Sequence, residues 1–173
     1  MTDPHPLPFL RIPFDVLIAL ADRHFQFALQ PYHFLIRLIH VLTAAAFFGG
    51  IVLFDLRLMG VRGTVPLKSF AEHTLPWLYV TFGVAFATGI LLFFYDPVHV
   101  GSHGYFTLKL ILLAIGLANA ALFRRTSYVA ALAAESAMPL KVRIGGAVSL
   151  AVWVGVMACA CLNTEGVPKV FLR

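Results

Sequence analysis

The stretch that decides the fold is residues 33–60, which read HFLIRLIHVLTAAAFFGGIVLFDLRLMG. It is apolar over the length that a membrane-spanning helix needs, about 20 residues for a hydrocarbon core of about 30 Å. Ionisable residues nevertheless interrupt it, namely His33, Arg37, His40 and Asp55. At about 100° per residue they fall on one face of a helix. Such a stripe in a membrane helix normally faces protein, a cofactor or water, so it marks the best clue to function.

The composition of the whole chain predicts a membrane protein. Of its 173 residues, 60% are hydrophobic and 12% are charged, whereas soluble domains average about 25% charged residues. The stretches that are long and apolar enough to cross a bilayer are residues 33–58, 73–95, 105–123 and 145–163. Their short connections predict one up-down bundle in which consecutive helices are antiparallel neighbours. The predicted fold class is therefore an all-α integral membrane protein with a four-helix transmembrane bundle over residues 33–173.

Residues 1–32 form a separate N-terminal part. From Pro13 to Gln30, polar and apolar side chains follow a helical spacing, which favours an amphipathic helix lying in the membrane interface. Pro31 should then turn the chain into the first span. The first residues lack the basic region and the small-residue cleavage site of a signal peptide, so we expect no cleaved leader.

The net charge of +5 does not indicate a nucleic-acid partner, because the basic residues gather in two loops between spans. The first loop holds Arg57, Arg62 and Lys68, and the third region holds Arg124, Arg125, Lys141 and Arg143. Positively charged loops usually face the cytoplasm, so both chain termini are expected on the opposite side. The partner that the composition itself implies is the lipid bilayer.

His40 is the candidate cofactor ligand, because it lies about 10 Å further along the helix than His33 at a rise of about 1.5 Å per residue. A buried imidazole is a common axial ligand of b-type haem, and a four-helix bundle provides the slot. Small side chains follow His40, and Arg37 lies one turn before it, where it could pair with a haem propionate. We therefore expect haem b at His40. A structural histidine, a copper ligand or a proton relay are the alternatives.

The second iron ligand is less defined. In an antiparallel bundle, Lys109 and Met157 lie near the depth of His40, and His99 and His103 lie over the same side. Each is a candidate ligand, and five-coordinate iron is the other option. Covalent c-type haem is excluded because the chain has no C-x-x-C-H motif. Lys109 could also hold a propionate or extend to the interface.

Other polar residues receive simpler interpretations. His33, His99 and His103 could form a surface copper or zinc site, since imidazole suits both metals. Asp55 and Arg57 are predicted to form a charge cluster at the membrane interface. Cys159 and Cys161 lie on different faces of the last span, so a disulfide is not expected and both are interpreted as small apolar residues.

The stretch HVLTAAAFFGGIVLFDLRLMG (residues 40–60) resembles the first helix of small bacterial membrane proteins with a His…Gly…Asp-Leu-Arg-Leu signature. TGILLF (residues 88–93) and FTLKLILL (residues 106–113) continue the likeness, which runs from about residue 33 to 125. The layout is similar to the HemJ-type protoporphyrinogen oxidases and to the copper-resistance D membrane domain.

That resemblance implies haem b, a functional first-helix histidine and a functional third-helix lysine, which correspond to His40 and Lys109. It also implies a location in the bacterial inner membrane. The chain departs from the HemJ-type pattern where Asp55–Leu58 replaces a Pro-Arg-Leu-Phe-like stretch, and this departure bears on the oxidase activity more than on the haem.

The favoured function is a b-type haem protein that transfers electrons within the membrane, alongside other membrane subunits. The second is an accessory subunit without redox chemistry, whose polar stripe packs against other helices. The third is a porphyrinogen oxidase, implied by the resemblance alone. The fourth is copper handling, for which the expected Met-rich and His-rich clusters are sparse.

Overall fold

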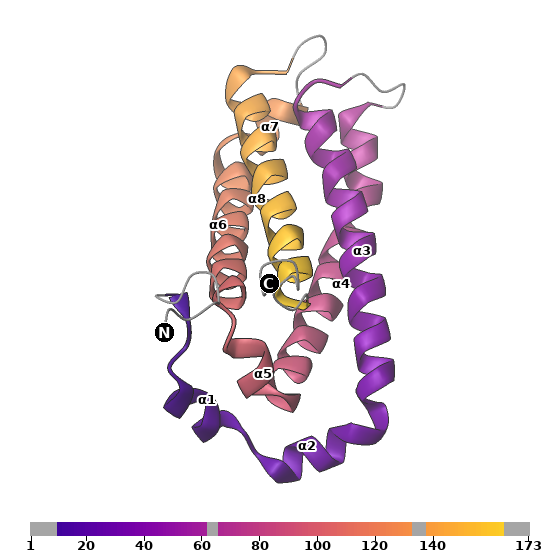
Figure 1. Cartoon of the computed structure of the whole chain (residues 1–173). Coiled ribbons are helices and arrows are strands. Elements are labelled where there is room, and N and C mark those ends of the chain that lie inside the picture. Colours follow the sequence, from indigo (N-terminus) through magenta and orange to yellow (C-terminus); the bar gives the residue numbers. More distant parts are fainter. Residues whose placement is uncertain (1–9, 62–65, 133–137, 165–173) are drawn as a thin grey trace, which may run out of the picture.

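The structure is a computed structural model, and it describes residues 10–61, 66–132 and 138–164. These residues are helical almost throughout (Figure 1). The helices in chain order are α1 (Phe14–Leu20), α2 (Arg23–Leu29), the 3-10 helix η2 (Gln30–Tyr32), α3 (His33–Leu58), α4 (Leu67–Tyr95), α5 (Pro97–Gly101), α6 (Gly104–Thr126), α7 (Tyr128–Leu132) and α8 (Leu140–Thr164). Four of them, α3, α4, α6 and α8, are long and apolar enough to cross a membrane. The predicted fold class is confirmed.

The boundaries of the long helices follow the predicted spans, with α3 covering residues 33–58 as expected. The second long helix, α4, begins at Leu67 and not at residue 73. Its first turns carry exposed Lys68 and Glu72, so these turns do not belong to the continuous apolar stretch that predicts a span. Leu67 and Ala71 on the opposite face are buried. The helix therefore starts amphipathic and becomes apolar only where it enters the bilayer.

The long helices pack as a series and not as a closed ring. Extensive contacts join α3 to α4, α3 to α8, and α6 to α8. Among the described elements, α4 and α6 pack less extensively, and side chains connect them: the Phe93 and Phe106 rings stack with centres 5.0 Å apart, and Arg124 Nη1 donates to the Tyr79 hydroxyl. Consecutive long helices are therefore neighbours as predicted, and α4 and α6 are the most loosely packed of these pairs. Figure 1 shows the two pairs, α3 with α4 and α6 with α8, side by side.

Small residues allow the close approaches between these helices, as is usual in membranes. A Cβ at Gly116 of α6 would lie 3.1 Å from the Trp153 ring of α8. A Cβ at Gly146 of α8 would lie 3.0 Å from both the Asp55 carbonyl oxygen and Leu58 Cβ of α3. Both glycines are therefore required by packing, and they position α8 against its two neighbours.

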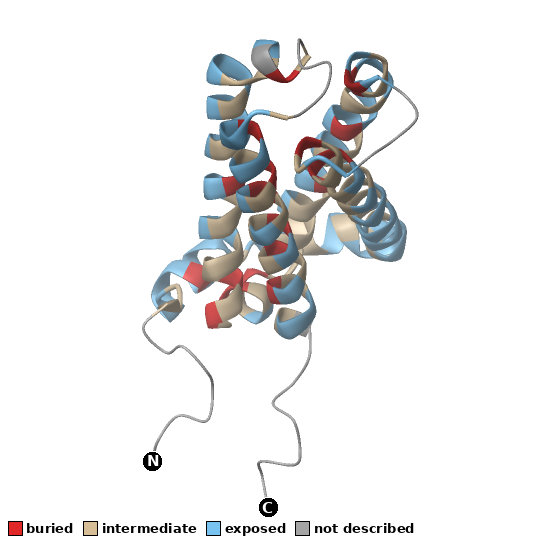
Figure 2. Ribbon diagram, turned by 90° about the horizontal axis from the view of Figure 1, so that it is seen from above, coloured by how far each residue is buried: buried red, intermediate tan, exposed pale blue. Residues whose placement is uncertain are grey.

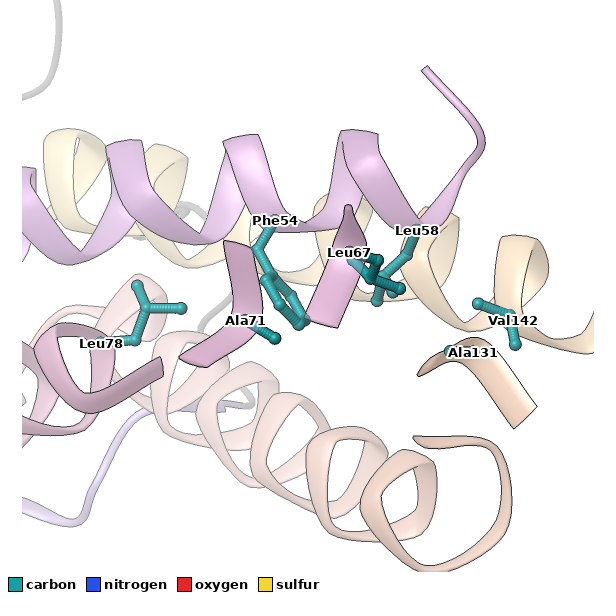
Figure 3. Packing of buried hydrophobic residues seen from close by; sticks show 7 residues of the cluster. All are labelled: Phe54, Leu58, Leu67, Ala71, Leu78, Ala131 and Val142. Carbon is teal, nitrogen blue, oxygen red and sulfur yellow. The ribbon is translucent and has the colours of Figure 1, made fainter. Parts of the chain in front are cut away.

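The apolar core lies at the end of the bundle where α3 ends and α4 begins. Phe54 and Leu58 of α3 meet Leu67, Ala71 and Leu78 of α4, and Ala131 and Val142 join from α7 and α8 (Figure 3). Elsewhere, buried positions face the interior and exposed positions predominate on the outside (Figure 2). Large exposed side chains such as Trp77, at 71% exposure, suit a surface whose solvent is lipid.

The end of α3 is fixed by a left-handed glycine and by an arginine of α8. Gly60 has a φ of 95°, a conformation that favours glycine. Its N–H donates to the Arg57 carbonyl at 3.2 Å, which closes the helix end. Arg143 Nε donates to the Met59 carbonyl at 3.0 Å. This contact ties the loop after α3 to the start of α8.

The N-terminal part consists of short helices and not of the single helix predicted from Pro13 to Gln30. The break falls at Ala21 and Asp22, both extended, and the Asp22 carboxylate accepts a hydrogen bond from His24 N at 2.8 Å. That cap favours a new start at α2. Leu17 of α1 is fully buried against Gly101 of α5. Figure 1 shows α2 crossing the lower end of the bundle before α3 rises from it.

Candidate functional site

Hydrogen bonds of its imidazole ring hold His40 of α3 against α4. Its Nδ1 lies 2.8 Å from the Ala85 carbonyl oxygen and 3.1 Å from Thr88 Oγ1. A carbonyl oxygen only accepts hydrogen bonds, so Nδ1 carries the hydrogen and donates it. Nε2 therefore keeps its lone pair. Within the described residues, no hydrogen bond is made by Nε2.

Two residues of α4 shape the place where the His40 ring lies. A Cβ at Gly89 would lie 3.0 Å from His40 Cε1 and 3.5 Å from Nδ1, so the ring occupies space that a side chain would take. The Thr88 hydroxyl donates to the Val84 carbonyl at 2.6 Å and is thereby oriented to accept from His40. These α4 residues were not predicted as partners, because residues about 45 positions apart give no pairing signal in one sequence.

Lys109 of α6 lies in the same layer, as the antiparallel arrangement predicts. Its charge is within electrostatic reach of His40 and of Cys159 on α8. Nζ lies 5.3 Å from the centre of the Phe106 ring, within the range of a cation–π contact. Cys159 is buried, with 5% exposure. The sequence alone predicts Cys159 to be a small apolar residue. Its electrostatic interaction with Lys109 depends on how α6 and α8 pack together.

The other predicted ligands are not joined to His40. His103 lies beside His99, with ring centres 5.7 Å apart, and its Nδ1 donates to the His99 carbonyl at 2.9 Å. Both stand at the junction of α5 and α6. Met157 is half-buried on α8, and Arg37 is exposed on α3 one turn before His40. The hydrogen bonds of His40 go to α4 and not to any of these residues.

Metal clusters of the usual kind are not found in the described part of the chain. No three or more His, Cys, Asp or Glu side chains gather there closely enough to hold a metal ion. His33 stacks on Tyr95 of α4 instead, with ring centres 4.3 Å apart and planes 24° apart. The surface copper or zinc site proposed for His33, His99 and His103 thus has no geometric support.

Asp55 departs most clearly from its predicted place. It was expected to form an interfacial cluster with Arg57, but its exposure is only 2%. Its carboxylate accepts a hydrogen bond from Ser149 of α8, while Arg57 Nη1 donates to the Val61 carbonyl at 3.2 Å. The prediction is wrong because Asp55 faces α8. A single sequence gives no sign of that neighbour.

No protein-family model matches the chain, and no curated protein or solved structure is significantly similar to it. What stands is a small four-helix membrane protein whose family is not identified. The functional roles that the HemJ-type resemblance implies for His40 and Lys109 are therefore proposals to be tested on this chain.

Proposed function

We propose that this chain is a membrane-embedded b-type haem protein that transfers electrons within the membrane, with His40 as an axial ligand through Nε2. One observation carries the proposal: His40 Nδ1 donates to the Ala85 carbonyl at 2.8 Å and so leaves the Nε2 lone pair available. Metal-binding histidines commonly donate their other ring N–H to a backbone carbonyl, which fixes the tautomer and the ring orientation. The imidazole is thus prepared for a metal before any metal arrives.

The residues around His40 fit the group in two further respects. Gly89 provides the space in which the edge of the His40 ring lies close to α4. Lys109, within electrostatic reach of His40, and Arg37, one turn away, supply positive charge for the haem propionates. When bound, haem supplies a carrier that accepts and releases one electron. The protein residues hold it, orient it and set its potential through nearby charge.

The test is a reduced-minus-oxidised absorption spectrum of the purified full chain, made with haem supplied during expression. A Soret band and α and β bands are expected, and His40→Ala should abolish them. The matched control is His73→Ala, because His73 is exposed on α4 and bonds only its own helix through the Ser69 carbonyl at 2.8 Å. A folded wild-type chain that remains colourless would overturn the proposal.

The ligand on the other iron face is assigned by the same spectra. His99, His103 and Met157 are the candidates, and separate substitutions should identify the one whose loss shifts the α band or converts the iron to high spin. If none does, the iron is five-coordinate. Lys109→Gln should keep the absorption bands. A redox titration of this variant should show a shifted midpoint potential, because a nearby charge is removed.

A second function is favoured by the same hydrogen bond. His40 joins α3 to α4 through Ala85 and Thr88, which suits a non-redox accessory subunit braced by a structural histidine. In that case a colourless chain is expected, and His40→Ala should lower its thermal stability without any spectral change. The HemJ-type oxidase alternative rests on resemblance alone, and a porphyrinogen turnover assay on the haem-loaded chain separates it from an electron carrier.

The membrane setting completes the proposal. The chain is a multi-pass membrane protein by its candidate spans. We propose the bacterial inner membrane, with both termini on the periplasmic side, on the basis of the basic loops after α3 and before α8. An electron carrier of this size needs a donor and an acceptor, so other membrane subunits are the proposed partners.

A further inference from the structure

A second site of different chemistry lies away from His40, near the opposite end of the bundle. It is a cavity of about 240 Å³ between α3, α4, α6 and α8, with α7 at its edge. We call it the α4–α6 cavity, because residues of α4 and α6, which pack loosely against each other, form much of its lining. The proposed haem site does not use it, since His40, Gly89 and Lys109 are not among its lining residues.

The α4–α6 cavity contains a buried carboxylate with an unfilled hydrogen-bonding position. Asp55 is 2% exposed, and one of its oxygens accepts from Ser149. Its other oxygen, Oδ2, is buried and has no hydrogen-bond partner among the residues that the structure describes. A buried polar atom left unpaired costs free energy, and an unpaired buried charge costs much more. Asp55 therefore provides a strong acceptor for any donor that enters the cavity.

The floor of the α4–α6 cavity is aromatic. Phe47 of α3, Phe82 of α4 and Trp153 of α8 contact one another, with ring centres 4.7 to 5.9 Å apart. All three line the cavity together with Asp55. Aromatic faces attract cations as well as apolar groups. The site thus combines one buried carboxyl group, which an entering cation would favour in its ionised form, with a surface that suits an apolar or cationic ligand.

Residues of α4 and α6 meet at the rim of the α4–α6 cavity. Arg124 Nη1 of α6 donates to the Tyr79 hydroxyl of α4 at 3.4 Å, and both residues are exposed. In a membrane-spanning chain, an opening between two spans leads sideways into the bilayer. A ligand dissolved in the lipid could therefore enter between α4 and α6 without crossing the aqueous phase.

We propose that the α4–α6 cavity binds a lipophilic organic amine. The ammonium N–H donates to the carboxylate of Asp55, and the apolar body lies against Phe47, Phe82 and Trp153. An anionic ligand is disfavoured because Asp55 would repel it at the buried end. The volume of about 240 Å³ lies just below the range of about 300–1,000 Å³ for drug-sized ligands. It suits one aromatic ring with a short amine-bearing chain.

Trp153 offers a direct reporter of binding. The chain has two tryptophans, and Trp77 is 71% exposed and does not line the α4–α6 cavity. In a Trp77→Phe background, Trp153 fluorescence is titrated with phenylbutylamine, phenylbutanol and phenylbutyrate, which share a body and differ in head-group charge. We expect a saturable response with the amine. Its affinity should exceed that of the alcohol by more than about tenfold, because only the amine pairs charge with Asp55.

Variants on two helices test the residues separately. Asp55→Asn should weaken amine binding by more than about tenfold, because the charged partner is lost. Ala120→Phe fills the α4–α6 cavity from α6 without touching Asp55 and should abolish binding. Ala118→Phe is the matched control, because Ala118 is also exposed on α6 but does not line the cavity. Arg124→Gln should raise amine affinity, because it removes a positive charge from the lining of the cavity.

Three results would overturn the proposal. One is an amine titration without a saturable Trp153 response. Another is equal amine affinity in wild type and Asp55→Asn, which would make the cavity an unselective apolar space. The third is preferred binding of phenylbutyrate that is lost in Arg124→Gln, which would assign an anion site. If Asp55→Asn does not fold, the amine-to-alcohol ratio and the Ala120 and Ala118 pair decide the outcome.

Discussion

The ring of His40 occupies the space beside Gly89, so that a Cβ on that glycine would lie 3.0 Å from His40 Cε1. Such a contact would be tighter than ordinary van der Waals packing, and it would fall on the ring edge between the bonded Nδ1 and the available Nε2. A shift of the α4 backbone at Gly89 would therefore move the His40 ring.

Gly89→Ala should displace the His40 ring and weaken its bond to the Ala85 carbonyl. Hydrogen bonds between membrane helices contribute about 0.6 kcal/mol on average, so thermal unfolding should shift by only a few degrees. In haem-loaded protein, the α band should broaden or lose intensity. Gly83→Ala is the control, because nothing lies within 4 Å of a Cβ there. Identical behaviour of the two variants would contradict the described place of His40.

Thr88→Val should remove one of the two acceptors of His40 Nδ1, at 3.1 Å, while the Ala85 carbonyl remains. The residual bond keeps the ring oriented, so the spectrum should persist. The midpoint potential should shift, because outer hydrogen bonds tune the basicity of a ligating histidine. Potentiometric titration of the haem-loaded chain measures this shift. Complete loss of haem in Thr88→Val would mean that the hydroxyl, and not the carbonyl, orients His40.

Gly146→Ala should destabilise the bundle, because the new Cβ meets the Asp55 carbonyl oxygen and Leu58 Cβ at 3.0 Å. Overpacking of this kind typically costs about 1–3 kcal/mol. Gly145→Ala is a closely matched control, since its nearest neighbour, Phe123 Cδ2, would lie at an ordinary 3.7 Å. Thermal unfolding in detergent measures the difference. Equal stability would show that α8 does not approach α3 as described.

Leu17→Ala should release α1 from α5 and leave the four long helices intact. Leu17 is fully buried, and Gly101 lies directly beneath it. Loss of a buried leucine typically costs about 2–5 kcal/mol. Leu17 is the buried residue of α1, a helix of 7 residues, so α1 should no longer stay packed against α5. Limited proteolysis should therefore cut near α1 in this variant. Ile18→Ala, at a position 52% exposed, should resist cleavage like the wild type.

The helical bundle could be predicted because its signal is local. Apolar length alone defined α3 to the residue, whereas Lys68 and Glu72 concealed the start of α4. The break at Ala21 and Asp22 was missed because the amphipathic pattern continues across it. Asp22 is a good cap residue, which was the available sign of a new helix start.

The surroundings of the candidate site were less predictable. The shared depth of His40 and Lys109 follows from helix rise and antiparallel order. The partners of His40 on α4 depend on helix rotation, and one sequence does not encode that rotation in any readable way. Asp55 was misplaced for the same reason. Its interpretation as an interfacial residue relied on its distance from the helix end, while its burial depends on Gly146 letting α8 approach.

The link between Asp55 and Ser149 has a consequence for how the protein is made. Asp55 lies on the first long helix, and Ser149 lies on the last. Chains fold as they emerge during synthesis, with N-terminal parts first. When α3 and α4 enter the bilayer, the carboxylate of Asp55 still lacks the Ser149 hydroxyl that donates to one of its oxygens. Assembly of the first pair of helices is therefore provisional, and translation of α8 completes it.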